Sequence, residues 1–194
     1  TLTGGLDGGA QALGIIAGDL VTGAAMTNIT DLDVSGTASL GGSVTTADSL
    51  TIDGTTTVST DVTLDSTGDQ NTDDISLAAV IGSGGTEDLI LDAGALAQIT
   101  ASGSITNLTD ISIRDSGGAT FGGAVTASSW FIISESAGDI IFNGALTAGT
   151  FTQTADTNTA YNLEFNAGGT ITDAVNFSNA GTVTIGNEST DNML

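Results

Sequence analysis

The chain contains no cysteine, no histidine, no lysine and no proline, and it has a single arginine, Arg114. Without cysteine it has neither disulfides nor thiolate metal sites. Without histidine or lysine, the usual catalytic triads, zinc sites and Schiff bases are excluded as well. The missing proline is typical of strands that are hydrogen-bonded on both edges, because proline has no N–H to donate.

Basic charge is almost absent: 23 acidic residues against one basic residue give a formal net charge of -22. Nucleic acids and anionic lipid surfaces are held through Lys and Arg, so we expect no nucleic-acid partner. No apolar run reaches about 18 residues, so we expect no membrane insertion. Such an acidic chain is best screened in a saline or calcium-bearing medium, which favours an extracellular or cell-surface location.

Helix formers and aromatic residues are scarce, whereas small β-forming residues are abundant. Aromatics make up 4% of the 194 residues, hydrophobic residues 39%, and there are 28 glycines. Val, Ile and Thr favour strands, and Gly, Asn and Asp favour the tight turns between them. The composition therefore predicts an all-β fold.

A repeat of about 21 residues is the strongest pattern in the chain. FGGAVTASSW (121–130) matches FNGALTAGTF (142–151) at an offset of 21, and LGGSVTTADS (40–49) and FNAGGTITDA (165–174) are further copies. In the first two copies Trp130 aligns with Phe151, which favours a position in the core for Trp130 over the alternative of a surface platform for a sugar. The asparagines that follow the repeated phenylalanines, at positions 143 and 166, are expected to stack on one another.

Short strands recur with the same internal pattern. Several begin with Asp and carry apolar residues at the second and fourth positions, as in DVTL (61–64), DLIL (88–91) and DISI (110–113). Alternation with a period of two sends the apolar side chains to one face and the polar ones to the other. A unit this short buries its apolar face only when it is stacked on copies of itself.

We therefore predict a parallel β-helix, or β-solenoid, of about nine rungs near 21 residues each. A β-sandwich is the alternative fold. Phe121, Phe142 and Phe165 should be neighbours in adjoining layers if the solenoid is correct. We expect the solenoid repeats over 29–194, and the Gly/Ala-rich segment 1–28 as a cap or an inter-subunit strand.

Three segments carry a resemblance to a known class of proteins: GDIIFNGALTAG (138–149), LTAGTFTQTA (146–155) and FNAGGTITDAVNFSNAGTVTIG (165–186). They resemble the β-strand repeats of large bacterial surface proteins, namely filamentous-haemagglutinin-like exoproteins and autotransporter passenger domains. This resemblance implies that the β-helix is right-handed, that the chain is exported, and that it serves adhesion or cell-surface structure. The matching positions are structural, so no functional residues are carried over.

Calcium is the one metal that the residue types favour. The stretch 65–74 brings four carboxylates into one turn region, and hard oxygen ligands in a loop suit Ca²⁺. A second stretch, GSGGTEDLIL (82–91), faintly resembles glycine-rich calcium repeats. No cofactor is required by the sequence, and Ca²⁺ is a candidate. The candidate ligands are Asp65, Asp69, Asp73 and Asp74.

The sequence favours a non-enzymatic, extracellular structural or adhesive solenoid of a microbial surface protein or filament. Its expected partners are further copies joined end to end, or more coils of a longer solenoid, and a glycan or a host or abiotic surface. A carbohydrate-active β-helix is one alternative, because Asp31 and Asp33 lie about 7 Å apart on one strand face, near the carboxylate spacing of inverting glycosidases. An ice-binding solenoid is another, because threonines such as 55–57, 150/152/154 and 182/184 could form outward ladders.

Overall fold

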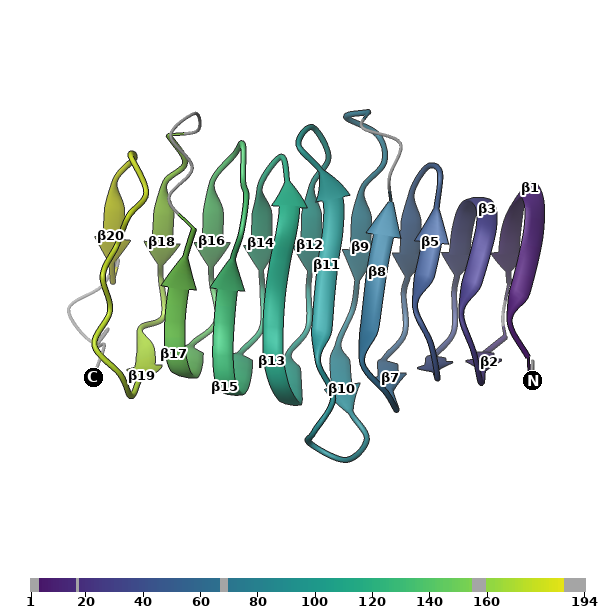
Figure 1. Cartoon of the computed structure of the whole chain (residues 1–194), viewed down its shortest axis with the longest axis horizontal. Helices are drawn as coiled ribbons and strands as arrows, with labels where there is room; N and C mark the ends of the chain where they lie inside the picture. The colour runs from purple at the N-terminus through teal and green to yellow at the C-terminus, as the bar shows by residue number, and fades with distance from the viewer. Residues whose placement is uncertain (1–3, 17, 67–69, 155–159, 187–194) are drawn as a thin grey trace.

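The computed structural model describes residues 4–16, 18–66, 70–154 and 160–186, which wind into one right-handed parallel β-solenoid (Figure 1). The chain runs up the front strands and down the back strands, and each circuit carries it from right to left. In these residues there is no helix, and hence no helical membrane span. The strands are β1 (Leu6–Ile15), β2 (Leu20–Thr22), β3 (Met26–Val34), β4 (Ala38–Leu40), β5 (Val44–Thr46), β6 (Leu50–Ile52), β7 (Thr56–Val58), β8 (Val62–Ser66), β9 (Ile75–Leu77), β10 (Val80–Gly82), β11 (Leu89–Gly94), β12 (Ile99–Ala101), β13 (Ile105–Ser116), β14 (Ala119–Phe121), β15 (Val125–Ile133), β16 (Ile140–Phe142), β17 (Leu146–Gln153), β18 (Leu163–Phe165), β19 (Gly169–Ile171) and β20 (Val183–Ile185).

Equivalent strands of successive turns, here called coils, pair in parallel and form three ladders. The back ladder consists mainly of β6, β9, β12, β14, β16, β18 and β20. The base ladder at the bottom of Figure 1 contains β2, β4, β7, β10 and β19, and the front ladder contains β5, β8 and β11. The longer strands bend round a corner: β1 and β3 run from front to back, and β13, β15 and β17 run from base to front.

The coil number and the mean coil length agree with the predicted repeat. The back ladder takes eight steps over the 170 residues between Leu13 and Val183, an average of about 21 residues in nine coils. Individual coils differ, with 18 residues from Leu20 to Ala38 and 27 from Leu64 to Leu91. At about 4.8 Å per step, the stack is about 38 Å long. The positions that pair from coil to coil along the back ladder are Leu13, Leu32, Leu50, Ile75, Ile99, Ala119, Ile140, Leu163 and Val183.

The core is a stack of like side chains, as the repeat predicts. The rings of Phe121 and Phe142 are stacked with centroids 5.0 Å apart, and those of Phe142 and Phe165 with centroids 5.2 Å apart. A second stack, Phe131 on Phe151, meets the first edge-on. The prediction that Phe121, Phe142 and Phe165 lie in adjoining layers is confirmed. The expected asparagine pair is present too, since Asn166 Nδ2 donates to Asn143 Oδ1 at 3.0 Å.

The glycines that follow these phenylalanines allow the corner backbones to touch. A Cβ added to Gly144 would lie 2.2 Å from the carbonyl carbon and oxygen of Gly123 in the coil before. No side chain fits at that distance, so the close approach of the two turns requires glycine.

One predicted copy of the repeat lies on a different face. LGGSVTTADS (40–49) begins at Leu40 in the base ladder, whereas Phe121, the residue matched to it, ends a strand of the back ladder. The corners of the solenoid are alike, so a similar segment can be used one third of a turn out of phase. MTNITDLDV of β3 and ITNLTDISI of β13 show the same offset, starting in the front and base ladders respectively.

The described part of the Gly/Ala-rich segment 1–28 lies against the stack. Strand β1 pairs with β3, and β2 pairs with β4, so these residues form the first coil and the start of the second. Leu6, Leu13 and Ile15 are partly buried against the core. The role of this segment as a cap or inter-subunit strand stays a prediction.

Candidate functional site

The carboxylates predicted to bind calcium point to different partners. Asp73 is buried, and its Oδ2 accepts the backbone N–H of Gln70 at 2.7 Å. Asp74 Oδ1 accepts the N–H of Gln98 in the next coil at 2.7 Å. Asp65 lies on β8, and its backbone partner in the neighbouring strand β11 is Asp92. Asp69 lies outside the described residues.

Across the ranges that the structure describes, no three acidic side chains come close enough together to share a metal ion. Asp65, Asp73 and Asp74 are therefore not brought into one cluster there. Calcium binding in this turn stays a prediction.

Aspartates at one corner of the solenoid, here called the corner aspartates, connect one coil to the next: Asp61 and Asp88 directly precede β8 and β11, and Asp110 holds the equivalent position within β13. Asp61 Oδ1 accepts the N–H of Asp88 at 3.0 Å, Asp88 Oδ1 that of Asp110 at 3.1 Å, and Asp110 Oδ1 that of Trp130 at 3.0 Å. On the back ladder Asp139 accepts the N–H of Asn162 in the same way. The sequence showed these aspartates only as outward polar positions. Their recurrence at the first position of strands was the signal for their role.

Stacking like charges changes the acidity of Asp88. Partial burial raises the pKa of the Asp88 carboxyl, and the charges of Asp110 and Asp61 add to the rise. The N–H of Asp110 acts in the opposite direction. Burial and the two neighbouring charges therefore disfavour the ionised form of Asp88, and the hydrogen bond from the backbone N–H of Asp110 offsets part of this free-energy cost.

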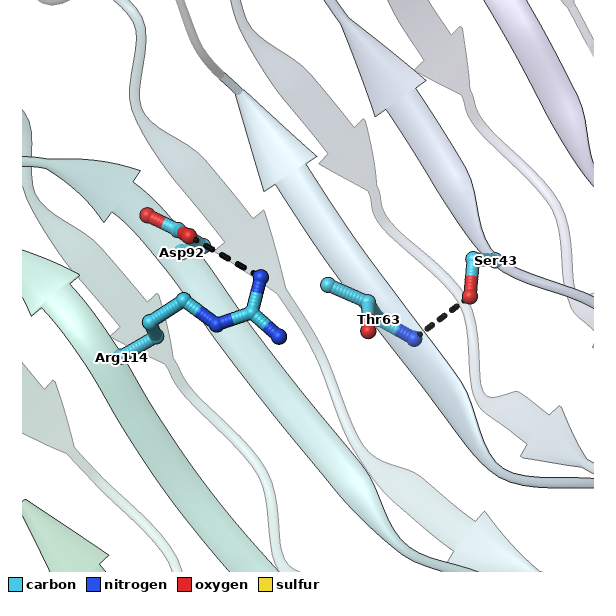
Figure 2. Close-up of polar contacts among 4 residues, drawn as sticks. All are labelled: Ser43, Thr63, Asp92 and Arg114. Carbon is cyan, nitrogen blue, oxygen red and sulfur yellow. Dashed lines mark hydrogen bonds and ion pairs between the residues drawn. The ribbon is translucent and has the colours of Figure 1, made fainter.

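Arg114, the single basic residue, points toward the carboxylate of Asp92 in the preceding coil (Figure 2). Its Nη1 is 3.4 Å from Asp92 Oδ2, and its side chain is half exposed. Burial raises the pKa of Asp65 in the neighbouring coil, the Asp92 charge raises it further, and Arg114 lowers it. An exposed pair of this kind contributes little to stability. Figure 2 also shows a contact between coils in which the N–H of Thr63 donates to Ser43 Oγ at 2.9 Å.

The glycine-rich stretch 82–91 is organised by a buried glutamate. Glu87 Oε1 accepts the N–H of Gly84 at 2.7 Å and the hydroxyl of Ser83 at 3.0 Å, and Oε2 accepts the N–H of Thr86 at 3.1 Å. Burial alone would raise the pKa of Glu87, but the backbone N–H of Glu87 itself and the donors of Gly84, Ser83 and Thr86 lower it below the ordinary value. Both carboxylate oxygens of Glu87 therefore accept hydrogen bonds from within the loop.

The carboxylates considered for glycoside hydrolysis lie on the outer side of β3. Asp31 accepts a hydrogen bond from the Ser49 hydroxyl, and Asp33 is exposed. The inward neighbours of both, Leu32 and Val34, are buried in the core. The two carboxylates therefore share a face, as expected, and Asp31 also has a contact with the next coil.

The prediction that Trp130 lies in the core is wrong. Trp130 is 43% exposed, and it pairs with Thr150, whereas Phe131 pairs with Phe151 and fills the core. The register of β15 against β17 shifts by one residue between Ala127 and Trp130. A bulge of this kind turns the following side chains to the other face, and the sequence offset of 21 did not reveal it.

The outward threonines line up in a row that crosses coils. Thr126, Thr147 and Thr170 are partners in the base ladder, and the same outward row contains Val21, Ser39, Thr57 and Ile81. None of these side chains is charged. Thr150 and Thr152 lie instead on the front ladder, beside Trp130 and Ile132.

Comparison of the chain with protein-family models, with curated proteins and with solved structures gave no match.

Proposed function

We propose that the chain is an extracellular structural and adhesive β-solenoid of a microbial surface protein or filament. The observation that carries this proposal is the stack itself: nine coils joined by parallel ladders around a continuous core. Such a rod is stiff, and its charge keeps it soluble. Arg114 leaves trypsin one site of attack. The resemblance to exoprotein and passenger-domain repeats supports the same assignment.

The two ends of the described stack support association end to end. Strand β1 pairs only with β3, and β19 and β20 each pair on one side, with β17 and β18. At the far end Val175, Phe177 and Val183 are only partly buried, and Ile185 is 51% exposed. Unpaired strand edges above an open apolar core are templates for a further coil. That coil comes from a second copy or from more of the same solenoid.

Electron microscopy and sedimentation velocity over a range of concentrations test this proposal. We expect rods about 38 Å long that lengthen in multiples as the concentration rises. Ile185→Lys, at the end of the stack, should suppress lengthening, because it places a charge on the exposed edge. Leu96→Lys is the matched control, because Leu96 is similarly exposed (59%) but lies in a turn in the middle of the stack. Lengthening that is equal in both variants, or absent in the wild type, would rule out growth through the ends.

One observation favours a second candidate, the ice-binding solenoid. The outward row of the base ladder is uncharged, and Thr126, Thr147 and Thr170 occupy it in three successive coils, about 4.8 Å apart. A regular row of hydroxyl and methyl groups is the type of surface that can order water on a lattice. Thermal hysteresis of ice growth tests this candidate, with Thr147→Lys as the variant that should abolish it.

A further inference from the structure

Strand β15 presents an apolar strip on the outside of the front ladder. Trp130 and Ile132 point outward, while Phe131 and Ile133 between and beyond them are buried. In Figure 1 this strand lies between β13 and β17, near the end of the front ladder that contains the C-terminal coils. Residues two apart on a strand are about 7 Å apart, so the indole and the isoleucine form one continuous strip.

Hydroxyls and carboxylates border this strip on both sides. Asp110 and Ser112 of β13 are the partners of Trp130 and Ile132 in the coil before, and Thr150 and Thr152 of β17 are their partners in the coil after. Neighbouring coils are about 4.8 Å apart, so all four polar side chains lie beside the strip. Beyond them, Asp173 accepts a hydrogen bond from the Thr150 hydroxyl. We call these residues the Trp130 surface.

The two carboxylates of the Trp130 surface are fixed in place by the protein. Asp110 uses Oδ1 to accept the N–H of Trp130, and Asp173 uses Oδ2 to accept the Thr150 hydroxyl. Each carboxylate has a second oxygen that can accept a hydrogen bond from a ligand. Carboxylate oxygens are strong acceptors for hydroxyl donors.

An apolar centre with a rim of acceptors complements a pyranose ring. One face of the sugar consists of C–H groups, which pack on an indole, and its hydroxyls radiate from the edge toward the rim. The charge of the chain selects among glycans. With a net charge of -22 and one arginine, uronic acids and sulfated sugars are repelled, so the ligand must be neutral. Asp110, Asp173 and the face of the indole would also attract a cation. Ile132 and the three hydroxyls instead complement the C–H face and the hydroxyls of a sugar, and the binding experiments below distinguish the two ligands.

We propose that the Trp130 surface binds a neutral polysaccharide, with one pyranose ring stacked on Trp130. This inference names the ligand class for the adhesive part of the proposed function and rests on it. The surface is an open sheet face, so it contacts one or two sugar rings of an extended chain. A typical ligand efficiency applied to one ring gives a dissociation constant on the order of 1 mM. Many copies on one filament would multiply that affinity through avidity.

The chain carries its own reporter, because Trp130 is its single tryptophan. Titration with cellohexaose, xylohexaose, mannohexaose and chitohexaose should shift the indole fluorescence in a saturable way for at least one of them. Retention on an insoluble form of the same polysaccharide should fall about tenfold in Trp130→Ala. Thr150→Val should weaken retention less, because it removes one hydroxyl from the rim.

Ile81→Ala is the matched control, because Ile81 is 40% exposed on the base ladder, away from the Trp130 surface. It should bind like the wild type. Circular dichroism should show that Trp130→Ala keeps its fold, since the removed side chain lies outside the core. Failure of all four sugars to bind, or equal binding by Trp130→Ala, would overturn the inference.

Two further results would also overturn it. Stronger, salt-sensitive binding of hexalysine would identify a cationic partner, and a concentration-dependent dimer lost in Trp130→Ala would identify a second copy of this chain. In each case the microscopy of rod length is unaffected, so failure of the glycan site is distinguishable from failure of the rod proposal.

Discussion

Replacing Phe142 with alanine is the most direct test of the stacked core. Phe142 is fully buried, and its ring lies 5.0 Å from that of Phe121, 5.2 Å from that of Phe165 and 5.2 Å, edge-on, from that of Phe131. Truncation of a buried phenylalanine costs about 3–5 kcal/mol. Loss of three ring contacts places Phe142→Ala at the upper end of that range, because each favourable aromatic pair contributes about 0.5–1.5 kcal/mol beyond burial.

Urea unfolding followed by circular dichroism and by Trp130 fluorescence measures this cost. In a solenoid each coil contacts only its neighbours, so a weak coil can uncouple the two sides of the stack. We therefore expect a lower midpoint and a reduced m-value or a second transition in Phe142→Ala. Phe177→Ala is the control, because Phe177 is only partly buried, and its ring is tilted against those of Phe151 and Phe165 with centroids 6.1 Å away. Equal losses in the two variants, or a loss below about 1 kcal/mol in Phe142→Ala, would refute the stacking.

Three other predictions concern the corners, the carboxylates and calcium. Gly144→Ala should lower the free energy of unfolding by about 2 kcal/mol or more in urea titrations, whereas Gly14→Ala, where a Cβ meets nothing within 4 Å, should be nearly neutral. The folded pKa of Asp88 is raised, so its contribution to stability is present at low pH and is lost as pH rises through that pKa. Asp88→Asn should therefore raise the thermal midpoint at pH 7, with a gain in the free energy of unfolding of less than about 1 kcal/mol. This gain should vanish at acid pH, where the carboxyl of Asp88 is protonated. A gain that does not depend on pH would contradict the charge argument. If the turn 65–74 binds calcium, millimolar Ca²⁺ should raise the thermal midpoint and a chelator should lower it, with Mg²⁺ as control; an unchanged melting curve counts against the site.

The fold could be predicted from the sequence because large side chains mark equivalent positions. Phe121, Phe142 and Phe165 repeat at nearly the mean coil length, so their register was readable without the structure. The first coils are shorter and have no aromatic marker, so their 18-residue steps were not found. The face on which a segment lies was not readable either. Segments of the same pattern serve different ladders, as Leu40 and Phe121 show.

The candidate sites were harder to predict than the fold. The repeat predicts a core position for Trp130, because an alignment of fixed offset does not reveal a bulge of one residue. The density of carboxylates in the sequence predicts calcium ligands, but Asp73 and Asp74 accept backbone N–H groups that lie in different turns. The role of a carboxylate in a solenoid depends on the residue above it in the stack, which is 18 to 27 positions away along the chain.

The corner aspartates give the stack a direction. In each of these contacts the acceptor belongs to the earlier coil and the donor to the later one, as for Asp61, Asp88 and Asp110. Each folded coil therefore presents carboxylate acceptors in fixed positions before the next coil folds onto it. A chain that emerges with its N-terminus first can therefore fold coil by coil, with each coil positioned by the acceptors of the coil before it.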